Sequence, residues 1–308
     1  MTPKPVVCVG AAIIDDSFFC MDKPAHGTSN PATHHRSAGG VARNVAHHLA
    51  QLGDRVELIA HFGNDTDGQW LKEQCSSAGI GLSHSRFSSA GTGRFTAIVS
   101  PGGELFAGAA DAHCEITISY LTEQTALFKT ASLVFVDCNL SVSCLEWLLE
   151  FCRTQSVPCV IDPVSVAKAS RLSAVSLEDV LLITPNRAEL SALSGNPAAG
   201  NTDSSIEHLL KKGVQKIWIR KGKEGSEFFS REETIKLPAP DVEVMDTTGA
   251  GDAALAGWIH AWLQDKSARE CLLYGHAMAA MILQTRGTQS SQLSAELLES
   301  KAAHRRTR

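Results

Sequence analysis

The sequence predicts an α/β fold in which a doubly wound, mostly parallel central sheet is covered by helices on both faces. Short apolar runs recur along the chain, and helical patterns separate them. The runs are apolar at nearly every position instead of every second one, as in strands that are buried on both faces of a parallel sheet. Alternation of strand and helix is typical of α/β proteins.

Six apolar runs are the predicted strands, and each is bounded by turn residues. They are PVVCVGAAII (5–14), RVELIAHFG (55–63), SLVFVDCN (132–139), VPCVIDPVS (157–165), DVLLITPN (179–186) and QKIWIRKG (215–222). Helices are predicted over 41–53, 143–155, 204–213 and 270–284. In the first, Val41, Val45, Leu49 and Leu52 fall on one helical stripe, and Gly53 supplies the stop.

Two segments depart from this rhythm. Residues 16–38 are rich in Pro, His, Ser and Thr without a helical period, and residues 88–110 alternate in a β manner around the turn SPGG. Both would leave the sheet at its carboxyl edge, where α/β proteins bind ligands. Because no internal repeat or long linker is present, we expect one domain over residues 1–308 that carries these segments as a small β lid.

Composition excludes several classes of protein. The chain has 308 residues, is 44% hydrophobic and 20% charged, and carries a net charge of −5, so no basic field favours nucleic acid. We expect the basic tail HRRTR to be a solvated terminus. No signal peptide and no run long enough to span a bilayer is recognised. The nine cysteines form no C-x-x-C pair, which favours reduced thiols in the cytoplasm, and the twelve histidines lack a metal-ligand pattern.

The stretch VMDTTGAGDAALAGW is the strongest chemical signal. Gly249 and Gly251 stand where a helix begins, and Asp252 is the first acid inside that helix. The exposed N–H groups and the positive dipole end of a helix start suit an anion, and glycine lets an oxyanion approach the backbone. The alternative is a glycine-rich cap with Asp252 acting only on the dipole. The phosphate-binding loop G-x-x-x-x-G-K-[ST] and the dinucleotide fingerprint G-x-G-x-x-G are both absent.

Four motifs together carry a family resemblance. They are AGGVARNVAHHLAQLG (38–53), TPNRAEL (184–190), RKGKEG (220–225) and DTTGAGDA (246–253), in family order and spread over essentially the whole chain. The sequence resembles the ribokinase-like PfkB family of carbohydrate and nucleoside kinases. That resemblance implies a three-layer α/β/α sandwich and an ATP-dependent transfer of phosphate to an alcohol.

Within the family, three stretches are most similar to those of pseudouridine kinases. They are GGVARN (39–44), VDCNLS (136–141) and DPVSVAKAS (162–170). The residues themselves add a weaker argument: DCN and DPVS follow successive strands, so Asn139, Asp162 and Lys168 should lie near the ligand edge. Loop capping and a surface lysine are the alternative.

Catalytic roles follow from the chemistry of phosphoryl transfer, which needs neutralised oxygens and a group that accepts the hydroxyl proton. Asp252 is the only acid at the predicted anion site, so we expect it to be the base. Backbone N–H groups of Gly249, Ala250 and Gly251 would stabilise charge on the transferred group. The resemblance implies the same roles.

The acceptor is expected on the first long motif. Gly39 and Gly40 permit close backbone approach, and the Asn44 amide can donate to and accept from vicinal hydroxyls. Asp15, at the end of the first strand, would accept from another hydroxyl. The family often has an asparagine where this chain has Ile13, so one polar sugar contact differs.

The nucleotide is expected along the later motifs. Asn186 and Glu189 would organise Mg²⁺ and its waters beside the triphosphate, with a helix cap as the alternative. Arg220, Gly222 and Gly225 would lie along the phosphates with Gly249 and Gly251. By resemblance His276 is placed near the adenosine, with a core or surface histidine as the alternative. By resemblance too, Asp246 and the segment TRGTQSS (285–291) would hold a monovalent cation such as K⁺.

The sequence predicts an ATP- and Mg²⁺-dependent kinase that phosphorylates the 5′-hydroxyl of pseudouridine. A kinase of ribose, adenosine or another nucleoside is the alternative in the same class, and a catalytically silent sugar or nucleoside sensor is the alternative in another. The missing dinucleotide fingerprint disfavours an oxidoreductase. The partner is a small molecule, with neither nucleic acid nor membrane, and a homodimer that pairs through the exposed lid strands is expected.

Overall fold

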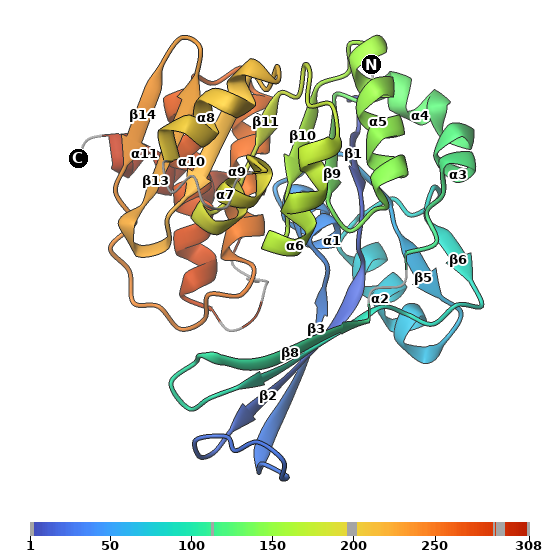
Figure 1. Cartoon of the computed structure of the whole chain (residues 1–308), viewed down its shortest axis with the longest axis vertical. Helices are drawn as coiled ribbons and strands as arrows, with labels where there is room; N and C mark the ends of the chain where they lie inside the picture. The colour runs from blue at the N-terminus through green and yellow to red at the C-terminus, as the bar shows by residue number, and fades with distance from the viewer. Residues whose placement is uncertain (1–2, 112–113, 196–201, 286, 288–292, 307–308) are drawn as a thin grey trace.

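The computed structural model describes residues 3–111, 114–195, 202–285, 287 and 293–306. Its centre is an eight-stranded sheet in the order β14-β13-β12-β11-β10-β9-β1-β4 (Figure 1). The strands from β4 to β12 are parallel, and β13 and β14 are antiparallel at one side. The bounds are β1 Val6–Val9, β4 Val56–Ile59, β9 Leu133–Asp137, β10 Cys159–Asp162, β11 Leu182–Ile183, β12 Lys216–Arg220, β13 Ser226–Ser230 and β14 Thr234–Leu237.

Two apolar layers cover the sheet, one on each face. Along β1, Val6 and Cys8 join one buried cluster, whereas Val7 and Val9 join the other. The first cluster contains residues of α1 Val41–Gln51, α2 Thr66–Ser77, α9 Ala250–Trp262, α10 Ala268–Leu283 and α11 Ala295–Arg306. The second contains residues of α3 Ile118–Glu123, α4 Thr125–Thr130, α5 Val142–Thr154, α6 Val166–Ala169, α7 Arg187–Leu193 and α8 Thr202–Lys211. The predicted three-layer α/β/α sandwich is confirmed.

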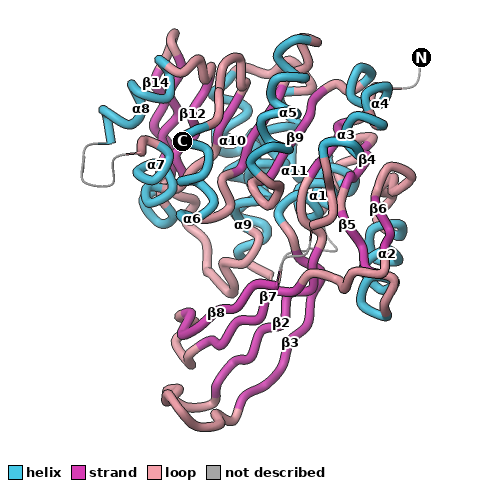
Figure 2. The backbone as a smooth tube through the Cα atoms, turned by 45° about the vertical axis from the view of Figure 1, so that its right-hand side comes forward, coloured by secondary structure: helices cyan, strands magenta, loops and turns pink. Residues whose placement is uncertain are grey.

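A second sheet projects from the carboxyl edge of the first, as Figures 1 and 2 show. It has the order β3-β2-β7-β8, with β2 Ile13–Cys20, β3 Ala32–Gly39, β7 Arg94–Val99 and β8 Leu105–Asp111. β2 and β3 form one antiparallel pair, β7 and β8 form another, and β2 runs parallel to β7. A third sheet has two short strands, β5 His61–Gly63 and β6 Arg86–Ser88.

Four features of the strands differ from the prediction. The run 5–14 divides into β1 and β2, because the chain turns into the second sheet after Gly10. The run 55–63 divides into β4 and β5, and the run 179–186 contributes only the two residues of β11. β13 and β14 were not predicted at all, since their pattern is partly polar: Phe228 and Ile235 are buried, but Glu227 is half-buried and Thr234 is exposed.

The predicted helices are all present. Of the predicted stripe, Val45 and Leu49 on α1 and Leu52 at its C-cap are at most 5% exposed, and Val41 is partly buried against the same core. Gly53 follows with φ +86°. The predicted helix 270–284 is α10, which begins earlier at Ala268 behind a capping box of Ser267 and Glu270. No helix in the described residues combines the length and the apolar character needed to cross a membrane.

Candidate active site

Polar residues at the carboxyl ends of neighbouring strands form one side of the site. Asp162 ends β10, Thr184 follows β11, and Arg220 ends β12. Arg220 Nη2 donates to Asp162 Oδ2 at 2.8 Å and to the carbonyl oxygen of Thr184 at 2.6 Å. Thr184 Oγ1 also donates to Asp162 Oδ2, at 3.0 Å. Three adjacent strands are thus joined at the edge where parallel sheets bind ligands.

The start of α9 faces this cluster. Gly249 is the N-cap residue in the left-handed region, with φ +75°, and Asp252 is the third residue of the helix. Among the described residues, no acceptor is bonded to the backbone N–H of Gly251 or of Asp252. A Cβ on Gly251 would lie 2.5 Å from Arg220 Nη1. Glycine at this position therefore lets Arg220 pack on the helix start, in addition to leaving N–H groups for an anion.

Asp252 is partly buried and lies against α1. Its Oδ2 accepts a hydrogen bond from Asn44 Nδ2 at 2.8 Å, across 208 residues of sequence. Burial raises the pKa of Asp252 to about 7, and the nearby charge of Asp162 adds to the rise, whereas Asn44 and Arg220 oppose it. A carboxylate whose pKa lies near neutrality is a more effective proton acceptor than an ordinary aspartate.

The glycine pair and Asp15 come together where β3 meets β2. A Cβ on Gly39 would lie 2.1 Å from Asp15 Oδ2. Gly40 has φ +93°, and its Cβ would lie 2.3 Å from the carbonyl oxygen of Ala11. Burial raises the pKa of Asp15 to about 6, against the opposing positive charge of Arg43. Packing against the backbone and the positive φ thus require glycine at position 40, whereas a side chain at position 39 would displace the Asp15 carboxylate. The approach of both glycines to a ligand stays a prediction.

Asp137 organises the acceptor side, although sequence reasoning did not select it. Its Oδ2 accepts from the backbone N–H of Ala11 at 3.0 Å and of Ala42 at 2.9 Å, and its Oδ1 accepts from the N–H of Asn139 at 2.9 Å. Burial raises its pKa, and these hydrogen bonds oppose the rise. Asp137 joins the end of β9 to the β1–β2 turn and to the start of α1. An acid at the end of an apolar strand was the available signal.

Lys168 and Asn139 are brought together by the loops that follow β10 and β9. Lys168 Nζ donates to Asn139 Oδ1. The Asn139 carbonyl, a candidate acceptor for a base N–H, thus already accepts from Lys168, and the two side chains form one unit. Burial lowers the pKa of Lys168, and the negative charge of Asp137 opposes this change. Arg171 Nη2 holds the same pair of loops together by donating to the Cys138 carbonyl at 2.9 Å.

The predicted nucleotide motifs lie side by side. Asn186 and Glu189 form a capping box at the start of α7, with both hydrogen bonds at 2.9 Å. Arg187 on α7 forms a bidentate ion pair with Glu224 in the RKGKEG turn, at 2.9 and 2.7 Å. Gly222 in that turn has φ +56°, and a Cβ on it would have no heavy atom of the described residues within 4 Å. The backbone is therefore open to a ligand on the Gly222 side.

Comparison with known proteins shows the family of the chain. The family model for pfkB family carbohydrate kinases matches residues 4–295. The chain belongs to the pfkB carbohydrate kinase family. Members of this family are ATP-dependent phosphotransferases that act on hydroxyl groups, and the chain is a kinase of the ribose, nucleoside or sugar type.

Relatives with different names match the chain similarly well. It is 29% identical over 296 residues to an uncharacterized sugar kinase, YeiI, of Escherichia coli, covering 94% of this chain and 81% of the relative. It is 28% identical over 295 residues to pseudouridine kinase of E. coli, covering 94% and 93%. The Arabidopsis thaliana ribokinase structure with ribose and ATP superposes with a TM-score of 0.81 at 23% identity, covering 98% and 99%, which supports the shared fold.

Asn186 and Glu189 are the residues of this pfkB kinase that are predicted to organise Mg²⁺ and its waters. Glu189 is 4% exposed, and its Oε2 accepts from the Asn186 N–H in the capping box. In the described residues, no group of three or more His, Cys, Asp or Glu is placed to hold a metal ion. The structure shows the helix-cap alternative, because Asn186 and Glu189 are both engaged in the capping box. Their role toward Mg²⁺ and its waters stays a prediction.

Two predicted residues of this pfkB kinase have other contacts. His276 is 6% exposed, its Nε2 lies 2.7 Å from Ser226 Oγ, and its ring is 6.4 Å from that of Trp218. The structure thus shows the alternative of a core histidine, and its role toward adenosine stays a prediction. Both Asp246 oxygens accept backbone N–H groups at 2.9 Å, Oδ1 from Thr248 and Oδ2 from Gly287. Of the predicted cation segment 285–291, residues 286 and 288–291 lie outside the described residues.

Gly225 also has a structural explanation. Its φ is +91°, and a Cβ there would lie 2.0 Å from the carbonyl oxygen of Leu237 on β14. The residue allows the turn to pass against the antiparallel strand, whereas Gly222 faces open space. Of the two glycines in the motif, Gly222 is thus the better candidate for nucleotide contact.

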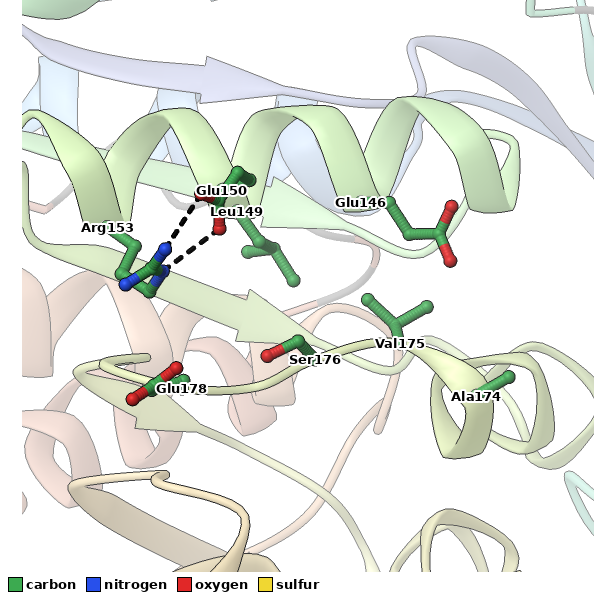
Figure 3. Close-up of a pocket in the computed structure, with 8 residues that line it drawn as sticks. All are labelled: Glu146, Leu149, Glu150, Arg153, Ala174, Val175, Ser176 and Glu178. Atoms are coloured by element: carbon green, nitrogen blue, oxygen red, sulfur yellow. Dashed lines mark hydrogen bonds and ion pairs between the residues drawn. The ribbon is translucent and has the colours of Figure 1, made fainter.

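A hollow of the surface lies beside α5, and none of the predicted site residues lines it. Figure 3 shows it between α5 and the chain that follows the 3₁₀ turn Ser170–Ala174. Glu150 and Arg153 form an ion pair across one turn of α5 at its rim. The catalytic candidates gather instead at the carboxyl edge of the sheet.

Proposed function

We propose that the chain is an ATP-dependent kinase that transfers the γ-phosphate to the 5′-hydroxyl of pseudouridine, giving pseudouridine 5′-phosphate and ADP. The observation that supports transfer chemistry is the placement of Asp252 in the first turn of α9, behind a left-handed Gly249. A candidate base and N–H groups open to an anion occupy the same helix start, which is what a phosphoryl group and its acceptor require.

In the proposed step, the 5′-oxygen attacks the γ-phosphorus while the bond from that phosphorus to the β–γ bridging oxygen breaks. Asp252 takes the hydroxyl proton, and ADP leaves with the bridging oxygen. The Ala250 N–H already donates to the Thr247 carbonyl oxygen at 3.3 Å, so of the three predicted donors those of Gly249 and Gly251 donate to the charge on the transferred group. Mg²⁺, when bound with the nucleotide near Glu189 and Asn186, neutralises phosphate charge.

The choice of pseudouridine rests on the loops that carry Asn139 and Lys168, together with the similarity to pseudouridine kinase. Pseudouridine and uridine share the ribose, and the C-glycosidic base presents one further N–H. Lys168 can donate to a base carbonyl, and Asn139 Oδ1 keeps one lone pair for a second donor. A site that leaves buried polar groups unpaired with the wrong substrate discriminates strongly.

Two alternatives share the same scaffold. The similarity to an uncharacterized sugar kinase favours another ribosyl or sugar acceptor as the first alternative. A silent sensor of sugars or nucleosides is the second. The hydrogen bond from Asn44 to Asp252 and the raised pKa of Asp252 disfavour it, because a sensor has no need of a base.

The deciding experiment is a panel of acceptors with ATP: pseudouridine, uridine, adenosine, ribose and fructose. We expect the largest kcat/KM for pseudouridine, and a smaller ratio to uridine in Lys168→Ala and Asn139→Ala. If the wild type prefers another acceptor, the assignment of pseudouridine as the substrate is wrong, but the assignment of kinase activity stands. No phosphorylation of any acceptor favours the sensor. Unchanged ratios in both variants would remove these two residues from base recognition.

The lid and the cation complete the proposal. We propose that the sheet β3-β2-β7-β8 covers the acceptor and excludes water, because a wet γ-phosphate is open to hydrolysis. Phe19 and Leu105 on that sheet are 41% and 61% exposed, and pairing with a second subunit would cover such strands. We also propose that Asp246 supports K⁺ binding through the backbone it orders.

A further inference from the structure

Arg43 precedes Asn44 on α1 and is buried although it is charged. It is 1% exposed, and its Nη1 donates to Asn44 Oδ1 at 2.8 Å. Asn44 Nδ2 in turn donates to Asp252 Oδ2 at 2.8 Å. The three side chains form a continuous series of hydrogen bonds that runs from the interior of α1 to the first turn of α9.

The direction of this series is fixed by chemistry. A guanidinium only donates, and an ionised carboxylate only accepts. The amide of Asn44 lies between them, so its oxygen must face Arg43 and its NH₂ must face Asp252. The flipped amide would set NH₂ against the guanidinium and oxygen against the carboxylate, which loses both hydrogen bonds. Arg43 therefore selects one of the two amide orientations.

The surroundings of Arg43 explain why a charge is kept there. Cys75 on α2 hydrogen-bonds to the guanidinium, and Asp15 on β2 and Asp252 on α9 attract it. A buried cation without such partners is costly. Arg43 is thus close enough to be attracted by two acids: Asp15, the proposed acceptor contact, and Asp252, the proposed base.

We propose that Arg43 is a positioning residue for phosphoryl transfer: it fixes the Asn44 amide with its NH₂ toward Asp252 and so holds the base in one rotamer. This inference rests on the proposed function, in which Asp252 accepts the hydroxyl proton. Arg43 itself touches no reacting atom, and its effect passes through Asn44.

The test is a double-mutant cycle with Arg43→Met, Asn44→Ala and the double variant, measured with the best acceptor of the panel. Arg43→Met should lower kcat/KM for that acceptor by about 10–100-fold, the range for a hydrogen bond to a charged group, mainly in kcat. The KM for ATP should stay within about twofold, and in the Asn44→Ala background the same change should cost less than about twofold. Additive losses would overturn the proposal, since they mean that Arg43 acts without Asn44.

Two control variants separate positioning from folding. Leu49→Ala removes a fully buried side chain from the same helix and should lower the melting temperature without lowering kcat/KM of the folded protein. Arg153→Met removes an exposed arginine at the hollow of Figure 3 and should change neither. If Leu49→Ala lost as much activity as Arg43→Met at an equal loss of melting temperature, the effect of Arg43 would be structural and the proposal wrong.

A readout without substrate keeps the inference separate from the proposed function. In wild-type protein with ¹⁵N-labelled asparagine, the two Asn44 side-chain amide protons should exchange slowly with solvent, and the Asp252→Ala variant should shift their signals. Rapid exchange of these protons in the wild type overturns the ordered amide, even if Arg43→Met does not fold. Failure of every acceptor in the panel defeats the kinase proposal alone, because this measurement needs none.

Discussion

The central sheet and the projecting sheet reach stability in different ways. Val7 and Val134, on neighbouring strands of the central sheet, are 0% exposed because helices cover both faces. The projecting sheet is far more open, and six of the seven residues of β8 are exposed. Core packing fixes the side chains that follow the central strands, whereas few core contacts restrain the exposed strand β8.

Ion pairs take the place of a core at the base of the projecting sheet. Asp16 on β2 is 6% exposed, accepts from His34 Nε2 at 2.7 Å when that nitrogen is protonated, and pairs with Arg94 on β7. Arg94 and Arg36 also pair with Asp67 on α2. Charges thus anchor one end of the sheet to the main body. We expect catalysis to depend on the residues at the edge of the central sheet, and closure over the acceptor to depend on the projecting sheet. Four measurements test this expectation.

The largest effect is expected for Asp252→Asn, in the fixed region. The amide is nearly isosteric and cannot take the hydroxyl proton, so turnover should fall by about 10²–10⁴-fold, the usual contribution of a general base. Nucleotide affinity and melting temperature should stay near the wild type. The measurement is kcat together with ATP binding by calorimetry, and a variant with near wild-type kcat would remove Asp252 from the role of base.

Asn44→Ala should weaken the acceptor more than ATP. Asn44 on α1 contacts Asp252 on α9. The Gly222 turn, where the nucleotide is proposed to bind, lies beside α7 instead. Loss of a hydrogen bond to an uncharged hydroxyl costs about 0.5–1.5 kcal/mol, so the KM for the acceptor should rise several-fold with little change for ATP. Steady-state kinetics with each substrate varied in turn provides the measurement. Equal weakening of both would contradict the separation of the two subsites.

The pH dependence of kcat/KM should report Asp252. The active form is the carboxylate, and its pKa is raised to about 7 by burial and by Asp162, so activity should fall as pH drops through 7. Asn44 and Arg220 lower this pKa. Asn44→Ala should therefore move the acid limb to higher pH, whereas the surface variant Arg153→Met should leave it in place. A limb that moves to lower pH in Asn44→Ala would contradict the assignment.

The smallest effect is expected in the projecting sheet, and it is measured on the wild-type protein without any substitution. Backbone amides of residues 16–38 and 88–110 should exchange more slowly when the acceptor binds, because closure would cover strands that are now exposed. Hydrogen exchange read by mass spectrometry measures this, with β9 and β10 as an internal reference that is already buried. Slowing confined to the turns around Gly222 and Gly249 would contradict the lid.

The sequence predicts those parts of the fold and of the candidate site that depend on residues close together in the chain. Gly249, Gly251 and Asp252 lie within four residues at one helix start, so helix chemistry alone predicts an anion site there. Strand and helix patterns predict the layered fold for the same reason. β13 and β14 were not predicted, because the partly polar pattern of these two short strands at one side of the sheet resembles loop sequence.

By itself, then, the sequence determined the layered fold, the family and the helix start that carries Asp252. Only the tertiary structure decided which distant side chains meet there. Asp137 joins backbone groups 95 and 126 residues away, and Asn44 reaches Asp252 across 208 residues. Lys168 donates to Asn139 Oδ1, the oxygen that we propose accepts a base N–H. Such contacts depend on how helices and strands pack, and no local pattern encodes that packing.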